Sequence, residues 1–324
     1  MLQSSLKTIS ILVITYNHEK YLAQALNGIL EQTVNAKLEV IIGDDGSTDG
    51  TLNIAHSYQQ KHPELIKILS APKNTGHTRN YERAWKEAKG DYIAHCDGDD
   101  YWIDPLKLSR QLDFLENNPQ YSCCAHKIWA ISEDDNSKHG PLPRTDMSSF
   151  DTQALLEACF PHNCSLLFRN RIFSTLPDFF FNLTGHDWCI DLLNSLHGPI
   201  KILPEIMGVW RMRSKGLWGG RQSSFHLEHN IYFLTQIKAY LPQKNHKDIR
   251  KNLNRNYFLL SIEYLNEGNT SKANECLSKL FNSNSLFIIP TRKLLSLWGQ
   301  LKFPWLYQSM RNLRNHTLGE PPRS

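Results

Sequence analysis

The chain has 324 residues, of which 40% are hydrophobic and 10% aromatic, and this composition predicts a globular protein of one large or two ordinary domains. No apolar run reaches 18 residues and the N-terminus lacks signal-peptide features, so we expect a cytoplasmic protein. Residues 1–221 carry 22 Lys and Arg against 26 Asp and Glu, whereas residues 222–324 carry 14 against 6. The basic C-terminal part is a candidate for contact with an anionic surface, and a solvated helical face is the alternative.

Strand-like and helix-like patterns alternate along the first 117 residues. Short, mostly apolar runs predict strands at 9–14, 38–42, 66–69 and 91–95. Apolar residues at helical spacing predict helices at 19–32, 47–60, 80–89 and 105–117, with Ser47 or Thr48 capping the second and Pro105 in the first turn of the last. This alternation predicts an α/β fold with a mostly parallel sheet flanked by helices.

The rest of the chain is irregular at first and then helical. The polar stretch 132–149 predicts a mobile loop, and only helices are predicted from Ser223 onward. Helices at 257–266 and 271–281, joined by a tight turn, resemble a tetratricopeptide-type hairpin, although no 34-residue repeat is found. Residues 287–306 combine Trp298, Phe303 and Trp305 with basic residues, which predicts either membrane-surface contact or packing against the remaining chain. We divide the chain into residues 1–221 and 222–324.

Cysteine and histidine spacing does not indicate a metal site. The seven cysteines form no Cys-x-x-Cys pair, so neither a zinc site nor a disulfide framework is predicted. We interpret the cysteines as reduced, mostly buried thiols. His186 and the other histidines show no ligand spacing and are interpreted as structural or exposed.

Polar residues follow three of the predicted strands at the point where each strand ends. Residues 15–17 follow the first strand, 43–47 the second and 97–100 a later one. Ligands of a parallel sheet bind at these carboxyl ends, and three carboxylates within residues 97–100 oppose each other's ionisation unless a cation binds. Oxygen donors suit magnesium or manganese, whose other positions go to phosphate oxygens. The sequence therefore predicts the metal site of an enzyme that binds a diphosphate, although no glycine-rich phosphate loop is present.

Five ordered motifs resemble those of the family-2 glycosyltransferases of the GT-A fold. They are ISILVITYNHEKYL, EVIIGDDGSTDGT, NTGHTRNYERAWKEAKGDYIAHCDGDDYW, GHDW and GVWRMR, which together span residues 8–221. The resemblance implies inverting transfer of a sugar from a nucleotide-diphospho-sugar, with a UDP-sugar favoured, to a hydroxyl of a surface polysaccharide or lipid-linked glycan. It also implies a divalent cation (Mn or Mg) and no nucleic-acid partner. The basic tail adds peripheral contact with the cytoplasmic membrane face as an alternative location.

The resemblance assigns the metal ligands and the catalytic base by position. Asp97 and Asp99 match the D-x-D motif, with Asp99 for direct metal contact and Asp97 for ribose or metal, and Asp100 could replace either. Asp187 in GHDW would be the base that removes the acceptor proton, and a helix N-cap is its structural alternative.

The resemblance also assigns contacts to the nucleotide-sugar. Asp45 would accept hydrogen bonds from the base and so favour uracil. Arg213 stands where many relatives have histidine; it cannot bind a metal but can bind phosphate. Packing against a helix is the alternative for Tyr16, and a surface ion pair is the alternative for Arg79. The remaining nucleotide-sugar contacts would be Thr15, Tyr16, Asn17, Arg79, Asp97 and Arg211.

Two other functions remain compatible with this sequence. A nucleotidyltransferase also uses carboxylates and a metal at a parallel sheet, but the basic, glycine-rich triphosphate loop that such enzymes need does not follow the first strand. A catalytically inactive transferase-like scaffold could act through its helical tail. Glycines at 219 and 220, beside Trp218, predict either a loop that closes over the donor sugar or an ordinary flexible connection.

Overall fold

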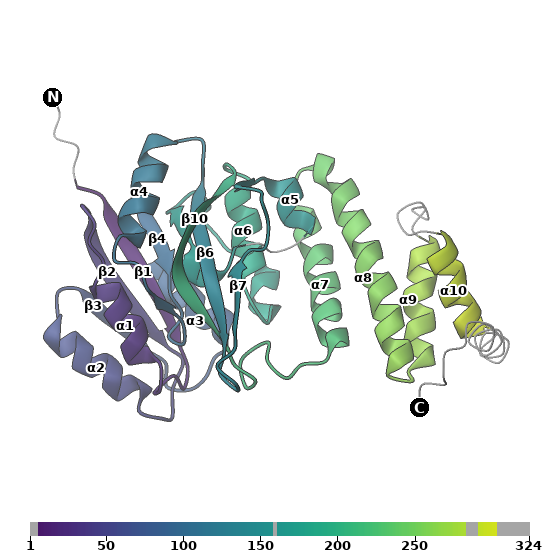
Figure 1. Ribbon diagram of the computed structural model, residues 1–324, viewed down its shortest axis with the longest axis horizontal. Coiled ribbons are helices and arrows are strands. Elements are labelled where there is room, and N and C mark those ends of the chain that lie inside the picture. Colours follow the sequence, from purple (N-terminus) through teal and green to yellow (C-terminus); the bar gives the residue numbers. More distant parts are fainter. Residues whose placement is uncertain (1–5, 158–160, 283–290, 303–324) are drawn as a thin grey trace. The chain divides into compact units, whose positions relative to one another are not determined.

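The computed structural model of the protein describes residues 6–157, 161–282 and 291–302 (Figure 1). By its internal contacts the chain divides into two compact units, residues 1–220 and residues 221–324. The first unit contains the sheet, and the described part of the second is helical.

The sheet of the first unit runs in the order β3-β2-β1-β4-β9-β6-β10-β5, with β7 beside β6 and β8 beside β10. The strands are β1 (Thr8–Thr15), β2 (Lys37–Asp44), β3 (Ile66–Ser70), β4 (Tyr92–His95), β5 (Tyr101–Trp102), β6 (Cys123–Ser132), β7 (Lys138–Leu142), β8 (Ser149–Phe150), β9 (Leu167–Arg169) and β10 (Ile200–Met212).

The helices cover the sheet and form the second unit. They are α1 (Leu22–Leu30), α2 (Thr51–Lys61), α3 (His77–Glu87), α4 (Lys107–Asn117), α5 (Thr152–Glu157), α6 (Asp187–Ser195), α7 (Ser223–Ile237), α8 (His246–Asn266), α9 (Thr270–Asn282) and α10 (Thr291–Lys302), with short 3-10 helices η1 (Asn163–Ser165), η2 (Asp178–Asn182), η3 (Lys238–Tyr240) and η4 (Gln243–Asn245). The alternation of strands and helices confirms the predicted α/β class.

The first four strands in the sheet order form its parallel part. β1 pairs with β2 and with β4, and β2 pairs with β3, all in parallel. Every residue of β1 from Ile9 to Thr15 is buried, which agrees with its nearly continuous apolar sequence. Parallel pairing brings the carboxyl ends of β1, β2 and β4 to one edge of the sheet, so the polar residues that follow them meet there.

The other part of the sheet is mixed, with one parallel pair and several antiparallel pairs. β6 pairs in parallel with β10, whereas β9 is antiparallel to both β4 and β6. The predicted loop at 132–149 is wrong in part, because β7 lies within it and pairs antiparallel with β6. The sequence of β7, with Gly140 and Pro141, has little strand character, and its conformation depends on pairing with β6.

The core of the first unit is formed by the parallel strands and the helices α1 and α4. Ile11, Leu26, Val40 and Leu112 are buried in one hydrophobic cluster. A Cβ added at Gly28 of α1 would lie 2.6 Å from the backbone oxygen of Trp102, so only glycine permits this close approach of α1 to β5. This packing fixes the segment that leads from β4 to α4.

The described cysteines are all buried and unpaired. They are Cys96, Cys123, Cys124, Cys164, Cys189 and Cys276, whereas Cys159 lies outside the described residues. The prediction of reduced, buried thiols is confirmed for these six.

The second unit packs its helices through leucine-rich faces. Leu277, Leu280, Leu294 and Leu297 form one buried cluster. The helices α8 and α9 form the predicted hairpin, and Gly268 in the turn has φ 77°, a conformation that favours glycine. Of the tail residues singled out in the sequence, Trp298 lies on α10, whereas Phe303 and Trp305 lie outside the described residues. Within the described chain, no helix combines the length and apolar character that a membrane span requires.

Candidate active site at the carboxyl edge of the sheet

A cavity of about 690 Å³ lies where the parallel strands of the first unit end. Its walls come from the segments after β1, β2 and β4, from the start of α3 and of α6, and from the end of β10 with the segment that follows it. His162 completes the lining before η1. The predicted site residues that line it are Thr15, Tyr16, Asn17, Asp45, Asp97, Asp99, Asp187, Arg211 and Arg213. Segments that are far apart in the sequence thus converge on one space.

The segment after β1 is fixed by the loop after β2. Asn17 has the left-handed φ of 55°, its backbone N–H donates to Ser47 Oγ (2.9 Å), and its side-chain oxygen accepts from the Thr48 N–H (2.8 Å). The prediction that Ser47 or Thr48 caps a helix is wrong, because α2 begins at Thr51 and these two residues bind Asn17 instead. The loop therefore orders a cavity residue.

Thr15 and Tyr16 present different surfaces at the end of β1. Thr15 is buried, and its hydroxyl has no hydrogen-bond partner among the described residues. Tyr16 is 40% exposed and lines the cavity, so it is not packed away against a helix. Tyr16 is therefore accessible to a ligand, whereas the Thr15 hydroxyl is a buried group without a partner among the described residues.

Asp45 holds the loop that enters α3. Its Oδ1 accepts hydrogen bonds from the backbone N–H and the hydroxyl of Thr75 (2.8 and 2.7 Å), and its Oδ2 accepts from the Gly76 N–H (2.9 Å). Asp45 is buried and lines the cavity. Part of its hydrogen-bonding capacity is therefore used to position the cavity wall.

Arg79 is not among the residues that line this cavity, and its contact with the nucleotide stays a prediction. Its guanidinium lies over the ring of Phe181, 5.1 Å from the centroid. Asn80 and Arg83 of the same helix face the sheet instead: the Asn80 amide donates to the Gly43 oxygen (2.6 Å) and Arg83 Nη2 donates to the Asp44 oxygen (3.0 Å). His77 and Asn80 are the described residues of α3 that line the cavity.

Asp97 has one carboxylate oxygen held and the other without a partner. Its Oδ2 accepts from the side-chain amide of Asn163 (3.1 Å), whereas its buried Oδ1 has no hydrogen-bond partner among the described residues. Burial and the neighbouring Asp99 raise the pKa of Asp97 to about 7. A carboxylate in this condition would be stabilised by a cation.

Asp99 differs from Asp97 because a guanidinium and an imidazole lie beside its carboxylate. Arg213 Nη1 lies 2.9 Å from its Oδ2, and His18 Nε2 lies 3.4 Å from the same oxygen. Burial alone would raise the pKa of Asp99, but His18 and Arg213 outweigh burial and lower the pKa below its ordinary value. Asp99 is therefore the ionised member of the group.

Asp100 is bound to the backbone of β10. Its Oδ1 accepts from the Arg211 N–H (2.9 Å), and its side chain is almost fully buried. Burial, followed by the charges of Asp99 and Asp97, raises the pKa of Asp100 well above its ordinary value. This environment makes Asp100 a less suitable ligand for a hydrated magnesium or manganese ion than Asp97 or Asp99.

Glycine separates Asp97 from Asp99 for a steric reason. A Cβ added at Gly98 would lie 2.8 Å from Thr15 Oγ1 and 2.9 Å from His18 Nδ1. Any other residue would push the end of β1 away from the Asp97–Asp100 segment. The Asp-Gly-Asp spacing therefore lets the two strand ends form one wall.

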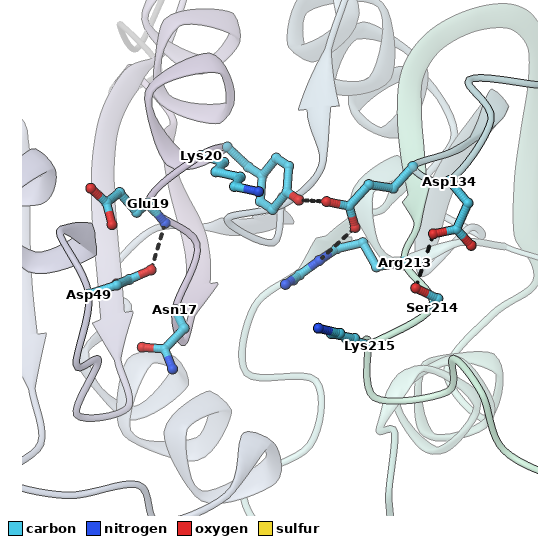
Figure 2. A pocket seen from close by; sticks show the side chains of 10 residues that line it. Asn17, Glu19, Lys20, Asp49, Asp134, Arg213, Ser214 and Lys215 are labelled. Atoms are coloured by element: carbon cyan, nitrogen blue, oxygen red, sulfur yellow. Dashed lines mark hydrogen bonds and ion pairs between the residues drawn. The ribbon is translucent and has the colours of Figure 1, made fainter.

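Arg211 and Arg213 extend from the end of β10 toward the carboxylates. Arg211 Nη1 donates to the backbone oxygen of Asp99 (2.6 Å). Arg213 lies between the cavity and a neighbouring polar hollow of about 420 Å³, where its Nε is 3.7 Å from Glu133 Oε2 (Figure 2). Lys215 lines both spaces. Arg213 thus has carboxylates on both sides.

Asp187 lies at the start of α6 and lines the cavity. The residue at the N-cap position is His186, and Asp187 belongs to the first turn, so the N-cap alternative for Asp187 is wrong. Burial, and secondarily the charge of Asp97, raise its pKa to about 6. Near neutral pH this carboxylate is mostly ionised yet close to its pKa, which suits a general base.

Four residues near the cavity carry no assigned role in the sequence interpretation. His18, His77 and His162 line the cavity, a position that the sequence interpretation of the histidines as structural or exposed did not include. The description holds for His186, which is buried and stacks on His77 at 4.7 Å between ring centroids. Asn163 of η1 is buried and holds Asp97. Of these four residues, only His18 could have been predicted from the sequence, because it directly follows the Thr-Tyr-Asn segment at the end of a predicted strand.

Similar solved structures share the fold. Staphylococcus aureus TarS residues 1–349, in complex with UDP-GlcNAc, superposes with a TM-score of 0.63 at 18% identity, covering 98% of this chain and 93% of that one. The mannosyltransferase PcManGT of Pyrobaculum calidifontis, in complex with GDP-Man and Mn²⁺, superposes with a TM-score of 0.57 at 15% identity, covering 97% and 86%. These likenesses confirm the GT-A fold.

Relatives in sequence match about two thirds of the chain. An uncharacterized protein of Mycobacterium tuberculosis H37Rv is 37% identical over 212 residues, which are 64% of this chain and 60% of that protein. An uncharacterized glycosyltransferase of Nostoc sp. PCC 7120 is 28% identical over 215 residues, 63% of this chain and 64% of that protein. The matches thus span about three fifths of the relatives' length. Residues 10–176, just over half of the chain, match the family described as glycosyl transferase family 2, to which this protein therefore belongs.

Proposed function

We propose that the protein is an inverting, cation-dependent glycosyltransferase that moves a sugar from a nucleotide-diphospho-sugar to a hydroxyl acceptor. The observation that carries this proposal is the convergence of Asp45, Asp97, Asp99 and Asp187 on one cavity that arginine also lines. Its volume of about 690 Å³ lies within the usual range for small-molecule sites.

The nucleoside would occupy the part of the cavity formed by the ends of β1 and β2. Thr15, Tyr16 and Asn17 line this part, and Asp45 lies at its wall with carboxylate lone pairs remaining for a base. We favour uracil on the resemblance of the Asp45 motif to those of UDP-sugar enzymes. TarS with UDP-GlcNAc and PcManGT with GDP-Man support a nucleotide-sugar donor as a class.

The residues present fit a hard divalent cation. Asp97 offers a buried oxygen without a partner, and Asp99 offers an ionised carboxylate, which together are the donors that magnesium and manganese prefer. Asp97 and Asp99 would hold this cation, which would stabilise the negative charge that develops on the leaving diphosphate. PcManGT, which contains Mn²⁺, supports a cation of this kind.

Asp187 would remove the proton from the attacking acceptor hydroxyl. The hydroxyl oxygen then forms a bond to the anomeric carbon as the bond from that carbon to the diphosphate breaks on the opposite face, which inverts the configuration. Arg213 would bind the diphosphate after exchanging its contact with Asp99 for phosphate oxygens. Asp187, with a pKa of about 6, is ionised at neutral pH and ready to accept the proton.

For the acceptor we propose a class of molecule, and for the location a cellular compartment. We assign a hydroxyl of a surface polysaccharide or lipid-linked glycan, to which a cytoplasmic enzyme touching the membrane face would have access. On α10, Leu295 and Trp298 are 61% and 39% exposed, and Arg292 is also exposed. Such a mixed apolar and basic surface favours peripheral contact with anionic lipid. In this proposal residues 1–221 are catalytic and residues 222–324 make the contact.

The donor is tested by screening nucleotide-sugars for protection against thermal unfolding in the presence of Mn²⁺, followed by turnover assays with and without EDTA. A bound donor raises the unfolding temperature according to its concentration and affinity. We expect protection by UDP-sugars and turnover that EDTA and Asp99→Ala abolish. Turnover unaffected by both would exclude the cation's role. Consumption of nucleoside triphosphate with sugar phosphate would favour a nucleotidyltransferase, and no binding of nucleotide or Mn²⁺ would favour an inactive scaffold.

A further inference from the structure

Three different donor side chains meet beside the cavity: Asp100 and His162 line it, and Cys164 is buried next to them. His162 Nδ1 lies 3.8 Å from Asp100 Oδ2 and 3.5 Å from Cys164 Sγ. All three donor atoms lie within 4.8 Å of one another. They come from the segment after β4 and from either side of Asn163 in η1, so the tertiary fold brings them together and sequence spacing does not reveal them.

The spacing of these atoms fits a tetrahedral metal site. Bonds of about 2.0–2.3 Å from zinc to oxygen, nitrogen and sulfur place neighbouring donor atoms roughly 3.3–3.8 Å apart. The separations of 3.5 and 3.8 Å at His162 fall in this range. A cation could therefore be bound with only small movements of the three side chains.

The donor types distinguish this cluster from the Asp97–Asp99 pair. Carboxylate oxygens alone suit magnesium or manganese, whereas a set that includes imidazole and sulfur selects zinc and similar thiophilic cations. The two sets share no residue, although Asp99 and Asp100 are adjacent in the chain. The Asp97–Asp99 pair and this cluster could therefore each bind a different kind of cation.

Surrounding contacts orient each donor. Asp100 Oδ1 accepts from the Arg211 N–H (2.9 Å), which leaves Oδ2 directed toward His162. The His162 ring packs against Trp210 at 4.7 Å between centroids. The Cys164 oxygen accepts from Trp102 Nε1 (2.8 Å), which fixes the backbone that carries the thiol. Such outer contacts set ligand orientation in metal sites.

We propose that Asp100, His162 and Cys164 form a second cation site, selective for a thiophilic divalent ion of the zinc class. Binding would deprotonate the Cys164 thiol and release that proton to solvent as the metal–sulfur bond forms. Asp100 and His162 line the cavity, so the ion would enter from there and its fourth position would face that space. The proposal does not depend on the transfer reaction, because it concerns only these ligands.

Cobalt absorption spectroscopy of the full chain tests the proposal. Co²⁺ is added to metal-free protein in excess Mg²⁺, and the spectrum is examined for a thiolate-to-cobalt charge-transfer band and the intense visible bands of tetrahedral cobalt. We expect one equivalent of Co²⁺ to produce both features and Zn²⁺ to remove them. Absence of a charge-transfer band in the folded wild-type protein would overturn the proposal.

Variants assign the site. Cys164→Ser should lose the charge-transfer band, whereas Cys96→Ser should retain it. Cys96 is a matched control because it is also buried and its thiol contacts the backbone oxygen of Asp100 (3.7 Å). Asp99→Asn should retain the band as well. A band that persists in Cys164→Ser, or that disappears in Asp99→Asn alone, would contradict the assignment. If Cys164→Ser does not fold, loss of tetrahedral cobalt bands in His162→Gln provides the second test, and their retention there also overturns it.

Discussion

The carboxyl edge of the sheet and the helical unit at residues 221–302 use buried polar groups in opposite ways. At the sheet edge, Asp97 and Asp187 are buried with raised pKa values of about 7 and 6, and Lys107 is buried over the Trp102 ring with its pKa lowered to about 7. In the described part of the helical unit, the buried polar residues are uncharged, such as Asn254 and Ser261, and ion pairs such as Lys279–Glu275 lie at the surface. The groups at the sheet edge therefore lower the stability of the fold and are suited to binding, whereas the packing of the helices stabilises the fold.

Replacing the proposed base should produce the largest effect at the sheet edge. Asp187→Asn removes the proton acceptor and keeps the side-chain shape, so we expect transfer to fall by about 10³-fold. UDP affinity, measured by calorimetry, should stay within a factor of a few of wild type. Retained transfer would assign the base to another residue.

A core substitution in the helical unit should lower stability without changing nucleotide binding. Leu277 is 3% exposed in the cluster with Leu280 and Leu294, so Leu277→Ala should reduce the free energy of unfolding by about 2–4 kcal/mol. Denaturant unfolding followed by far-UV circular dichroism measures this loss. A large loss of UDP affinity at temperatures where the variant is folded would contradict the division of roles.

Replacing a buried carboxylate at the sheet edge should instead raise the stability of the protein. Because the folded pKa of Asp97 is about 7 against an ordinary 3.8, the folded state holds more protons between these pH values and its stability falls as pH rises through this window. Asp97→Asn should therefore raise the free energy of unfolding at pH 8 by about 2–3 kcal/mol and have a much smaller effect at pH 4. Equal effects at both pH values would rule out this explanation.

The pH dependence of transfer should follow Asp187. With a pKa of about 6, its carboxylate becomes protonated as pH falls, so we expect the rate at pH 5 to be about tenfold below the plateau above pH 7. Steady-state rates at saturating donor and acceptor measure this profile, with folding checked at each pH. A rate that rises toward low pH would be incompatible with a carboxylate base.

The ion pair between Arg213 and Asp99 should oppose cation binding before the nucleotide arrives. Arg213→Ala frees Asp99 Oδ2, so Mn²⁺ affinity without nucleotide should rise by several-fold to about tenfold, while UDP affinity should fall. Electron paramagnetic resonance of free Mn²⁺ measures the first effect. Glu133→Gln is the matched control, because it removes the other partner of Arg213 and leaves Asp99 unchanged. Unchanged Mn²⁺ affinity in Arg213→Ala would refute the competition.

The sequence predicts the parallel strands and most of the cavity, because polar residues placed directly after apolar runs must meet at one edge of a parallel sheet. Asp97 was predicted in this way and through family resemblance, whereas Asp187 was predicted through family resemblance alone. The sequence did not show that Arg79 lies outside the cavity lining, because this depends on the phase of α3, which begins at His77, turns Asn80 toward the sheet and leaves Arg79 exposed. His162 and Cys164 lie in an irregular segment without periodicity, so only the tertiary fold reveals their proximity to Asp100.

The most direct test of the account is calorimetric titration of the full chain with UDP in the presence of Mn²⁺, in the presence of EDTA, and in Asp99→Ala. The cavity described here should bind one UDP per chain with Mn²⁺ and lose most of that affinity in the other two experiments. No UDP binding under any condition, or equal affinity in all three, would contradict the claim that these carboxylates hold a cation and a nucleotide diphosphate together.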